Sequence, residues 1–395
     1  MADGESIMSG AAWGQLLETL RDASKFVLAP EVPDDARHRA EGFRYLTRLL
    51  ASGLITCVEF ADADYPAFGR MVQPSMKWGL DCPDCLYLYA TIRGDAAYRI
   101  HGNRGGANHI DIQVNYGHFA SGDIGSWGTV SSMNGLELQS DADGAFELQL
   151  GGEQRGNWLA LAPNAEFVLI RQYFNDWDKE RPADLYIERI GATYPAPAPT
   201  PEQIEARFAR LQDWITKGGA LWERMSKAAL GMAPNSLNVY LPEDAGARAG
   251  MRGQAYGIGN FVCAPDEAVI IEFTPPACRH WTLGLANRYW ESLDYATCQT
   301  SLNGHQAALD SDGVFRGVIA HSDPGVANWL DTSGLTTGTL TARFLLADAA
   351  PEISFRIVPL SDVSSALPNA PRINASERAR VIEARRQAVE RRWQG

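Results

Sequence analysis

The sequence is short of several features that mark common classes of protein. Only six of its 395 residues are cysteine, too few for the disulfide framework of a small secreted domain. Lys and Arg total 35 against 48 Asp and Glu, a net charge of −13, which argues against binding nucleic acid or an anionic membrane surface. No apolar run approaches the roughly 20 residues that span a bilayer, and the first residues lack the pattern of a secretory signal. We therefore expect a reduced, cytoplasmic protein without nucleic-acid or membrane partners.

The motifs of the best-known enzyme classes are also missing. The chain has no Gly-x-Ser-x-Gly elbow, P-loop, dinucleotide-binding fingerprint or His-Glu-x-x-His helix, which disfavours common serine hydrolases, kinases, dehydrogenases and zinc peptidases. One Cys-x-x-Cys pair, Cys82 and Cys85, has no second pair or spaced histidines nearby to complete a zinc site. It also lacks a thioredoxin-like context, so packing or chance is the simpler interpretation. We expect neither a metal nor an organic cofactor.

Tryptophan and alternating strands are plentiful instead. The 11 tryptophans indicate large aromatic cores or an aromatic-lined pocket. Two long blocks alternate apolar and polar residues, as half-buried strands do, and helical patterns precede, separate and follow them. We predict a mainly β protein of two tandem jelly-roll-like antiparallel β-sandwiches. The expected regions are N-terminal helices at 1–55, a first sandwich at 80–192, a Pro-rich linker and connecting helix at 193–232, a second sandwich at 235–362 and a C-terminal amphipathic helix at 373–394.

Capping residues indicate where two of the helices begin. After the Pro-rich linker, Thr200 is placed to cap a helix, with Pro201 at its first position and Gln203 completing a capping box. Ser376 is the expected cap of the C-terminal helix, and Arg385 falls on its apolar face. We expect this helix to dock on the acidic body and to leave a basic face in solvent.

The two β blocks look like copies of one unit. Four segments recur in the same order: DADGAFELQL with DSDGVFRGVI, GNWLAL with ANWLDT, FVLIRQYF with LTARFLLA, and ADLYIERI with PEISFRIV. Arg171 falls opposite Arg343, and the offsets between equivalent positions stay nearly constant along the blocks. This agreement predicts a duplicated sandwich. A triplet present in both copies, Asn-Trp-Leu, is most simply a structural corner rather than catalytic chemistry.

The second block resembles a known bacterial family. The segment WTLGLANRYWESLDY, the following NGHQAALDSDGVFRGVIAHSDPGVANWLDTSG and the strand LTARF are similar to the domain of unknown function 1214, mainly over residues 235–362. The preceding block resembles the β domain that often accompanies it. This resemblance implies jelly-roll-like sandwiches and carries no general activity. The chain departs from the commoner NWLP ending at Asp331.

The densest group of chemical side chains lies at residues 287–306 and has no counterpart in the first block. Aromatic walls with a few polar groups are what a binding cleft requires, although such strands also fill sandwich cores. Both interpretations stay open. The candidate catalytic residues there are Glu291, Asp294, Tyr295 and His305. The candidate substrate-binding residues there are Arg288, Tyr289, Trp290 and Asn303.

Three candidates lie outside this segment. His321 shares a strand face with Asp323 and could act as an oriented general base. His109 and Asp111 share the polar face of a predicted strand, which either meets water or lines a cavity; solvent is the simpler interpretation. With His118, these two residues could also converge on a metal across strands.

Three functions from different classes follow. The first is a cofactor-independent enzyme that acts on a small aromatic or hydrophobic substrate by acid–base chemistry, with a catabolic lyase favoured over a hydrolase. The second is a carbohydrate-binding or glycoside-processing sandwich, since Trp290 and Tyr289 could stack on a sugar and Glu291 and Asp294 could form a carboxylate pair. A structural role, with the terminal helices making a homodimer contact, is the third.

Overall fold

The alternating residues of the first block form a two-layered sandwich in the computed structural model, which describes residues 4–241 and 253–393. One layer has, in spatial order, β1 (Gly69–Val72), β2 (Cys85–Thr91), β8 (Ala165–Tyr173), β4 (His109–Tyr116) and β5 (Gly128–Asn134). The other layer has β7 (Asn157–Leu159), β6 (Ala145–Leu150), β3 (Tyr98–Asn103) and β9 (Asp184–Arg189). The sandwich therefore begins at β1, before the boundary at residue 80 that the sequence suggested.

The second block repeats this architecture. Its five-stranded sheet runs β10 (Ser236–Tyr240), β11 (Gln254–Val262), β17 (Thr337–Leu345), β13 (His280–Ala286) and β14 (Ser301–Asn303). Its four-stranded sheet runs β16 (Trp329–Asp331), β15 (Phe315–Ala320), β12 (Glu267–Phe273) and β18 (Ser354–Pro359). Strand by strand, the two orders are the same, which confirms the predicted mainly β fold of two tandem sandwiches.

Pairing registers show which residues are equivalent in the two copies. Tyr87 on β2 lies opposite Arg171 on β8, and Tyr256 on β11 lies opposite Arg343 on β17. On the other side of the same arginines, Asp111 on β4 faces Arg171, and the corresponding residue of β13, Thr282, faces Arg343. The predicted match of Arg171 with Arg343 is therefore exact in register.

The repeated Asn-Trp-Leu triplet forms the same corner in each copy. Asn157 accepts a hydrogen bond from a backbone N–H at residue 139 and donates to two carbonyls, and Asn328 makes the equivalent three bonds. The indole N–H of Trp158 donates to the Gly151 carbonyl at 2.9 Å, and that of Trp329 donates to the Ala320 carbonyl at 3.0 Å. The triplet is architecture, as the duplication predicted.

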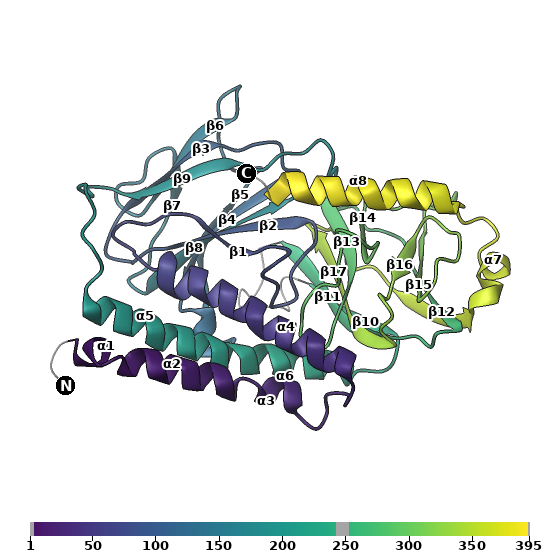
Figure 1. Ribbon diagram of the computed structural model, residues 1–395. Helices are drawn as coiled ribbons and strands as arrows, with labels where there is room; N and C mark the ends of the chain where they lie inside the picture. The colour runs from purple at the N-terminus through teal and green to yellow at the C-terminus, as the bar shows by residue number, and fades with distance from the viewer. Residues whose placement is uncertain (1–3, 242–252, 394–395) are drawn as a thin grey trace.

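The N-terminal and linking helices lie side by side along one side of the sheets (Figure 1). The predicted capping box is present: Thr200 accepts from the Gln203 backbone, and the Gln203 side chain accepts from the Thr200 backbone. These helices are α1 (Glu5–Met8), α2 (Ala11–Asp22), α3 (Lys25–Leu28), α4 (Ala36–Gly53) continued by η1 (Leu54–Glu59), and α5 (Pro201–Asp213) continued by η3 (Trp214–Gly218) and α6 (Gly219–Leu230). Short helical turns occur at η2 (Phe119–Ser121), η5 (Leu360–Asp362) and α7 (Val363–Ala366).

The C-terminal helix α8 (Ala375–Trp393) crosses both sandwiches on the opposite side of the molecule (Figure 1). Its cap is Asn374, which accepts from the Glu377 backbone, so the expectation of Ser376 was wrong. The docked face carries Arg378 and Arg392 as well as Arg385, and all three are buried. Arg380, Arg386 and Arg391 stay half-buried or exposed, so the basic residues of the helix divide between its docked side and its solvent-facing side.

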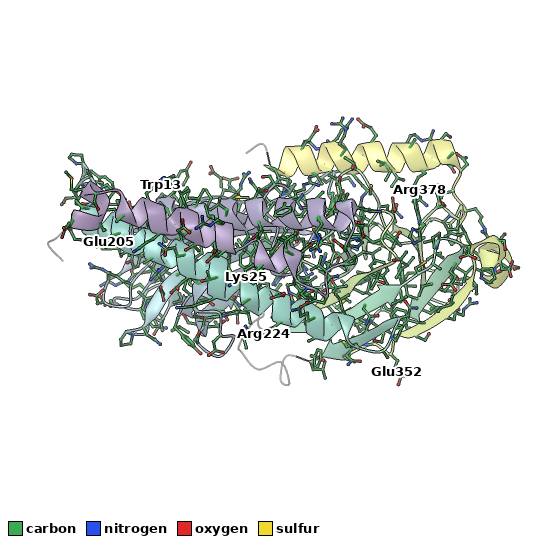
Figure 2. The ribbon with its side chains drawn as sticks, turned by 60° about the horizontal axis from the view of Figure 1, so that its bottom comes forward. Trp13, Lys25, Glu205, Arg224, Glu352 and Arg378 are labelled. Carbon is green, nitrogen blue, oxygen red and sulfur yellow. The ribbon has the colours of Figure 1, made fainter. Side chains whose placement is uncertain are left out.

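Each buried arginine of α8 is matched to a partner in the body of the protein. Arg378, labelled in Figure 2, pairs with Asp323 at 2.9 Å, and Arg392 donates to the Pro83 carbonyl at 2.7 Å. Arg378, Arg385 and Arg392 follow one another at intervals of seven residues, which keeps them on one side of the helix. Within residues 4–241 and 253–393, no helix has the length and apolar character needed to cross a membrane.

Removing the corner asparagine should cost more in the second sandwich than in the first. Asn328 is 4% exposed, so Asn328→Ala leaves buried backbone groups without partners and should lower the free energy of unfolding by about 1–3 kcal/mol. Asn157 is only half-buried, and water can replace its bonds, so Asn157→Ala should cost less. Denaturant unfolding of the two variants measures this difference. Equal losses would contradict it.

Candidate functional site

Each five-stranded sheet is buried on both faces. On β8, Val168 and Ile170 point into the first sandwich, while Leu169, Arg171 and Tyr173 point the other way. This outer face lies opposite the equivalent outer face of the second sandwich, because residues of β11 and β17 line the same space. The polar face of β4 is buried with it, so the interpretation that His109 and Asp111 meet solvent was wrong.

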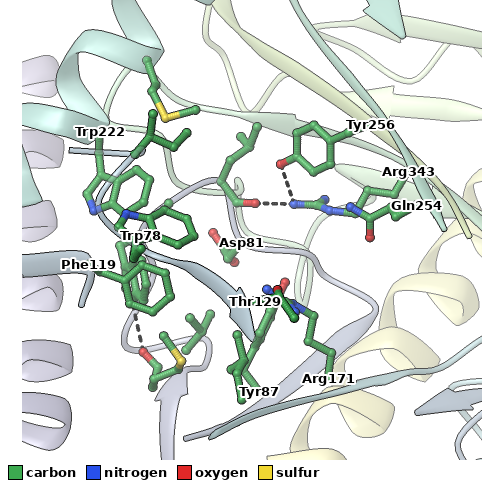
Figure 3. A pocket seen from close by; sticks show the side chains of 18 of the residues that line it. Trp78, Asp81, Tyr87, Phe119, Thr129, Arg171, Trp222, Gln254, Tyr256 and Arg343 are labelled. Carbon is green, nitrogen blue, oxygen red and sulfur yellow. Dashed lines mark hydrogen bonds between the residues drawn. The ribbon is translucent and has the colours of Figure 1, made fainter. Parts of the chain in front are cut away.

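A cavity of about 620 Å³ lies between the two outer faces and the helices. One side of it is aromatic and apolar (Figure 3). Trp78 contributes its ring in contact with Trp214, Trp222 and Phe119, at centroid distances of 4.7–5.4 Å. The apolar lining residues are Met71, Val72, Trp78, Leu80, Phe119, Ile124, Trp127, Val130, Leu169, Trp222, Met225, Ile258 and Trp290.

The opposite side of the cavity is polar, and Arg343, Tyr256 and Gln254 lie there (Figure 3). The two sandwiches are joined at this side, since the Tyr173 hydroxyl donates to Gln254 Oε1 at 2.9 Å. Burial raises the pKa of the Tyr173 hydroxyl well above its usual range, so it remains a neutral donor. The polar lining residues are Asp81, Tyr87, Thr129, Ser131, Ser132, Arg171, Tyr173, Tyr240, Gln254, Tyr256 and Arg343.

Arg343 is only 4% exposed, so its guanidinium needs hydrogen-bond acceptors other than solvent. Its Nη2 donates to the Leu80 carbonyl and to the Tyr256 hydroxyl, and its guanidinium lies 4.9 Å from the centre of the Tyr256 ring. Its Nη1 is buried and has no hydrogen-bond partner among the described residues. No ion pair joins it to a carboxylate in the part of the chain that the structure describes. The guanidinium therefore keeps an unused donor beside the cavity.

The backbone that meets Arg343 is strained. Leu80 and Trp290 adopt left-handed backbone conformations, with φ of 56° and 64°, which residues other than glycine rarely do. The Leu80 amide donates to the Trp290 carbonyl at 2.7 Å, so the two residues hold each other in place. This geometry turns the Leu80 carbonyl towards Arg343. Strain of this kind collects at ligand-binding sites.

Arg171, the equivalent residue in the first sandwich, has a different environment. Its Nη1 donates to Gln113 Oε1 and lies 3.7 Å from Asp111 Oδ2. Burial raises the pKa of Asp111 to about 7, and the neighbouring Arg171 opposes that shift. Asp111 is 1% exposed. This arginine therefore has a buried carboxyl group of its own.

Asp81 is the one carboxylate among the described lining residues. Its oxygens accept from the Ser292 amide at 2.8 Å and the Ser292 hydroxyl at 2.7 Å. Lys77 is buried in the same region, and burial lowers the pKa of Lys77 while the Asp81 charge opposes that shift. Asp81 is therefore the carboxylate best placed to exchange a proton with a molecule in the cavity.

Of the site residues predicted from sequence, only Trp290 lines the cavity. Its neighbours in the 287–306 segment hold the helices in place. Glu291 is fully buried against Arg48 of α4 at 3.0 Å, and burial raises its pKa. Tyr289 stacks on Tyr45 with ring centres 5.5 Å apart. The Arg288 carbonyl accepts from Ser226 of α6. These residues form packing contacts rather than one reactive group.

The later residues of the segment are also separate from the cavity. Asp294 is exposed and accepts from the Thr297 amide and hydroxyl, and Tyr295 is buried at 6.3 Å from the Trp177 ring. Asn303 is buried and donates to Asp84 at 2.7 Å. The His305 side chain is 54% exposed, and its Nε2 lies 3.7 Å from Asp176. The structure therefore does not bring the predicted catalytic residues together.

The remaining histidines and cysteines have structural surroundings. His321 contacts the Cys263 carbonyl at 3.0 Å, while Asp323 pairs with α8, so no His–Asp couple forms. Burial lowers the pKa of His109 to about 4 and that of His118 to about 3, which keeps both neutral. Among the described residues, no cluster of potential ligands could hold a metal, and Cys82 and Cys85 are buried free thiols.

Sequence reasoning missed Arg343, Tyr256, Tyr87 and Asp81 as site residues. The signal was present in the duplication, because Arg171 and Arg343 were aligned as equivalents. A charged residue repeated in the middle of two apolar strands indicates a shared buried function. Only the packing of one copy against the other shows that both arginines face a single cavity.

No protein-family model matches the chain, and no curated protein matches its sequence. Among solved structures, it is similar to an uncharacterised protein from Burkholderia cenocepacia with 32% identity and a TM-score of 0.85, covering 91% of this chain and 99% of that one. It also matches the VPA0106 protein from Vibrio parahaemolyticus with 12% identity and a TM-score of 0.44, covering 86% of this chain and 100% of that one. Neither match names a ligand or a reaction.

The pKa of Asp111 predicts how its replacement changes stability with pH. The folded chain keeps this proton up to a pH of about 7, whereas an unfolded aspartate loses it near 3.8. Unfolding therefore releases a proton in this window, and the Asp111 contribution to stability falls as pH rises. The stability of Asp111→Asn relative to the wild type should increase from pH 4 to 7, by at most about 1.4 kcal/mol per pH unit. Denaturant unfolding across this range measures the difference; a flat difference would contradict the prediction.

Proposed function

The chain belongs to the same family as the uncharacterised Burkholderia cenocepacia protein, and we propose that it binds and acts on a small aromatic or hydrophobic molecule that carries an anionic group. The cavity between the sandwiches is the proposed site. The observation that carries the proposal is the buried Nη1 of Arg343, which has no partner among the described residues.

A buried cationic donor without an acceptor is costly. Leaving a charged group unsatisfied costs more than the roughly 1–3 kcal/mol of a neutral group. Such a group persists where a ligand completes its hydrogen bonds, and guanidinium geometry fits a carboxylate or another planar anion. Two further lining donors, the indole N–H groups of Trp127 and Trp222, are also buried without partners in the described chain. All three favour a ligand with acceptor oxygens.

The size and the apolar walls of the cavity support the proposed aromatic or hydrophobic body of the ligand. A volume of about 620 Å³ is typical of small-molecule sites. Tryptophan, phenylalanine and methionine side chains cover the side opposite Arg343, where an apolar body would displace water favourably. The arrangement suits a molecule with one charged end and an aromatic or aliphatic body.

Acid–base chemistry, with a lyase as the favoured class, is the finer proposal. Asp81 supports it as the base, because this buried carboxylate lines the cavity. Tyr87 also lines the cavity, and burial raises the pKa of its hydroxyl well above the usual range, so this group stays neutral and can donate a hydrogen bond to a ligand. Asp81 replaces Asp294 and His305 as the proposed proton-transfer group.

Carbohydrate binding is the weaker alternative. Glycoside hydrolysis uses two carboxyl groups on either side of the scissile bond. The lining residues that the structure describes include one carboxylate, Asp81. Glu291 and Asp294, which the sequence suggested as a carboxylate pair, lie elsewhere: Glu291 binds Arg48, and Asp294 is in a turn. The aromatic residues line a cavity rather than a flat platform.

Membership of the domain of unknown function 1214 family is also proposed, on the motifs of the second sandwich.

The binding proposal is testable with naphthalene-2-carboxylate and its neutral analogue naphthalene-2-methanol. Calorimetric titration should show tighter binding of the carboxylate. Arg343→Gln should weaken carboxylate binding by about 10- to 100-fold, because it removes a charge-assisted hydrogen bond. It should leave alcohol binding nearly unchanged.

Arg386→Gln is the matched control, since Arg386 pairs with Glu383 and Glu390 on the outer face of α8. This variant should bind both compounds like the wild type. Benzoate and decanoate extend the test to smaller and aliphatic anions. The proposal fails if no member of the set binds, or if the wild type does not prefer the carboxylate to the alcohol.

A further inference from the structure

The two arginines of the cavity occupy equivalent positions, but their cross-strand neighbours differ. Each lies opposite a tyrosine on one side, Tyr87 for Arg171 and Tyr256 for Arg343. On the other side, Arg171 faces Asp111, whereas Arg343 faces Thr282. The two copies therefore differ at the position opposite the arginine, where the first has a carboxyl group and the second a neutral hydroxyl.

This divergence changes what each guanidinium offers to a ligand. Asp111 Oδ2 lies 3.7 Å from Arg171 Nη1, and Gln113 occupies the same nitrogen, so internal groups satisfy Arg171. Thr282 brings no charge to Arg343, whose Nη1 has no partner in the described chain. Both arginines are mostly buried, with 13% of the Arg171 side chain and 4% of Arg343 exposed. Solvent can therefore compensate little of either charge.

The other charges around the cavity also have opposite partners. Arg48 pairs with Glu291 at 3.0 Å. Asp81 and Lys77 are both buried, and the charge of Asp81 favours the charged form of Lys77. Among the described residues, Arg343 is left as the uncompensated cation of the cavity.

We propose that Arg343 alone anchors the anionic group of the ligand, and that Asp111 is a built-in counter-ion that prevents Arg171 from binding a second one. The site would therefore select monoanions and reject dianions of the same shape. This inference rests on the proposed function and narrows it to a substrate class. A second carboxylate bound at Arg171 would lie near Asp111, whose Oδ2 is 3.7 Å from the same guanidinium, and like charges repel strongly in such a water-poor interior.

Two matched pairs of probes test this selectivity: naphthalene-2-carboxylate with naphthalene-2,6-dicarboxylate, and decanoate with decanedioate. The rigid pair keeps one aromatic body, and the flexible pair tolerates different distances between the charged ends. Titrations at pH 8 keep Asp111 ionised, since its pKa is about 7. The wild type should bind the monoanion of at least one pair about tenfold or more tighter than the dianion.

Asp111→Asn removes the counter-ion with little change in shape, and Asp111→Thr installs the residue found in the second copy. In either variant the dianion should gain at least about tenfold relative to the monoanion. Arg343→Gln should weaken monoanion binding much more than Arg171→Gln does. Circular dichroism checks that each variant is folded. If neither Asp111 variant folds, the wild-type preference and the two arginine variants decide the matter.

The outcomes separate this inference from the proposal on which it rests. Failure of every probe to bind the wild type overturns both. Binding of mono- and dianion with equal affinity overturns the selectivity and leaves the cavity as a binding site. Equal loss of monoanion binding in the Arg171 and Arg343 variants overturns the assignment of Arg343 as the sole anchor. An unchanged ratio in a folded Asp111 variant overturns the role of Asp111.

Discussion

Burial of each five-stranded sheet on both faces is the constraint from which the rest of this structure follows. One face of each sheet packs inside its own sandwich, and the other must be covered by the second copy or by helices. Strand β13 shows the result, with every residue from His280 to Ala286 buried. The long helix of α5, η3 and α6 and the helix α4 close one side, and α8 closes the other (Figure 1). The cavity remains where these covers do not meet.

The same constraint explains why so many charges are buried. The outer faces of the five-stranded sheets carry polar residues such as Asp111, Gln254 and Arg343, and these residues are shielded from water in the folded chain. Isolated charges are costly there, so they occur in pairs such as Arg48 with Glu291 and Arg378 with Asp323. Among the buried arginines of α8, Arg378 follows this rule, whereas Arg385 and Arg392 donate to uncharged oxygens of the body. Among the described residues that line the cavity, Arg343 is the guanidinium without a carboxylate partner.

Local patterns in the sequence predicted the elements and the duplication well. Strand alternation and the Thr200 capping box depend on neighbours a few residues apart, and the repeated Asn-Trp-Leu corner bonds to backbone groups 10 to 20 residues away. The site was less predictable because it depends on residues far apart in the chain. His109 and Asp111 alternate with apolar residues as a solvent-exposed strand would, but both are buried in the folded chain. The 287–306 segment suggested a site because it is dense in polar and aromatic residues. In the structure these residues hold α4, α6 and α8 to the sheets.

The equal strand orders of the two sandwiches have an evolutionary meaning. Both copies present the same face to the shared cavity, as the subunits of a twofold homodimer do. In a homodimer encoded by one gene, every substitution appears twice, and both arginines would keep identical neighbours. Two copies within one chain can differ, as Asp111 and Thr282 do at equivalent positions, and the shared cavity therefore has two chemically distinguishable ends.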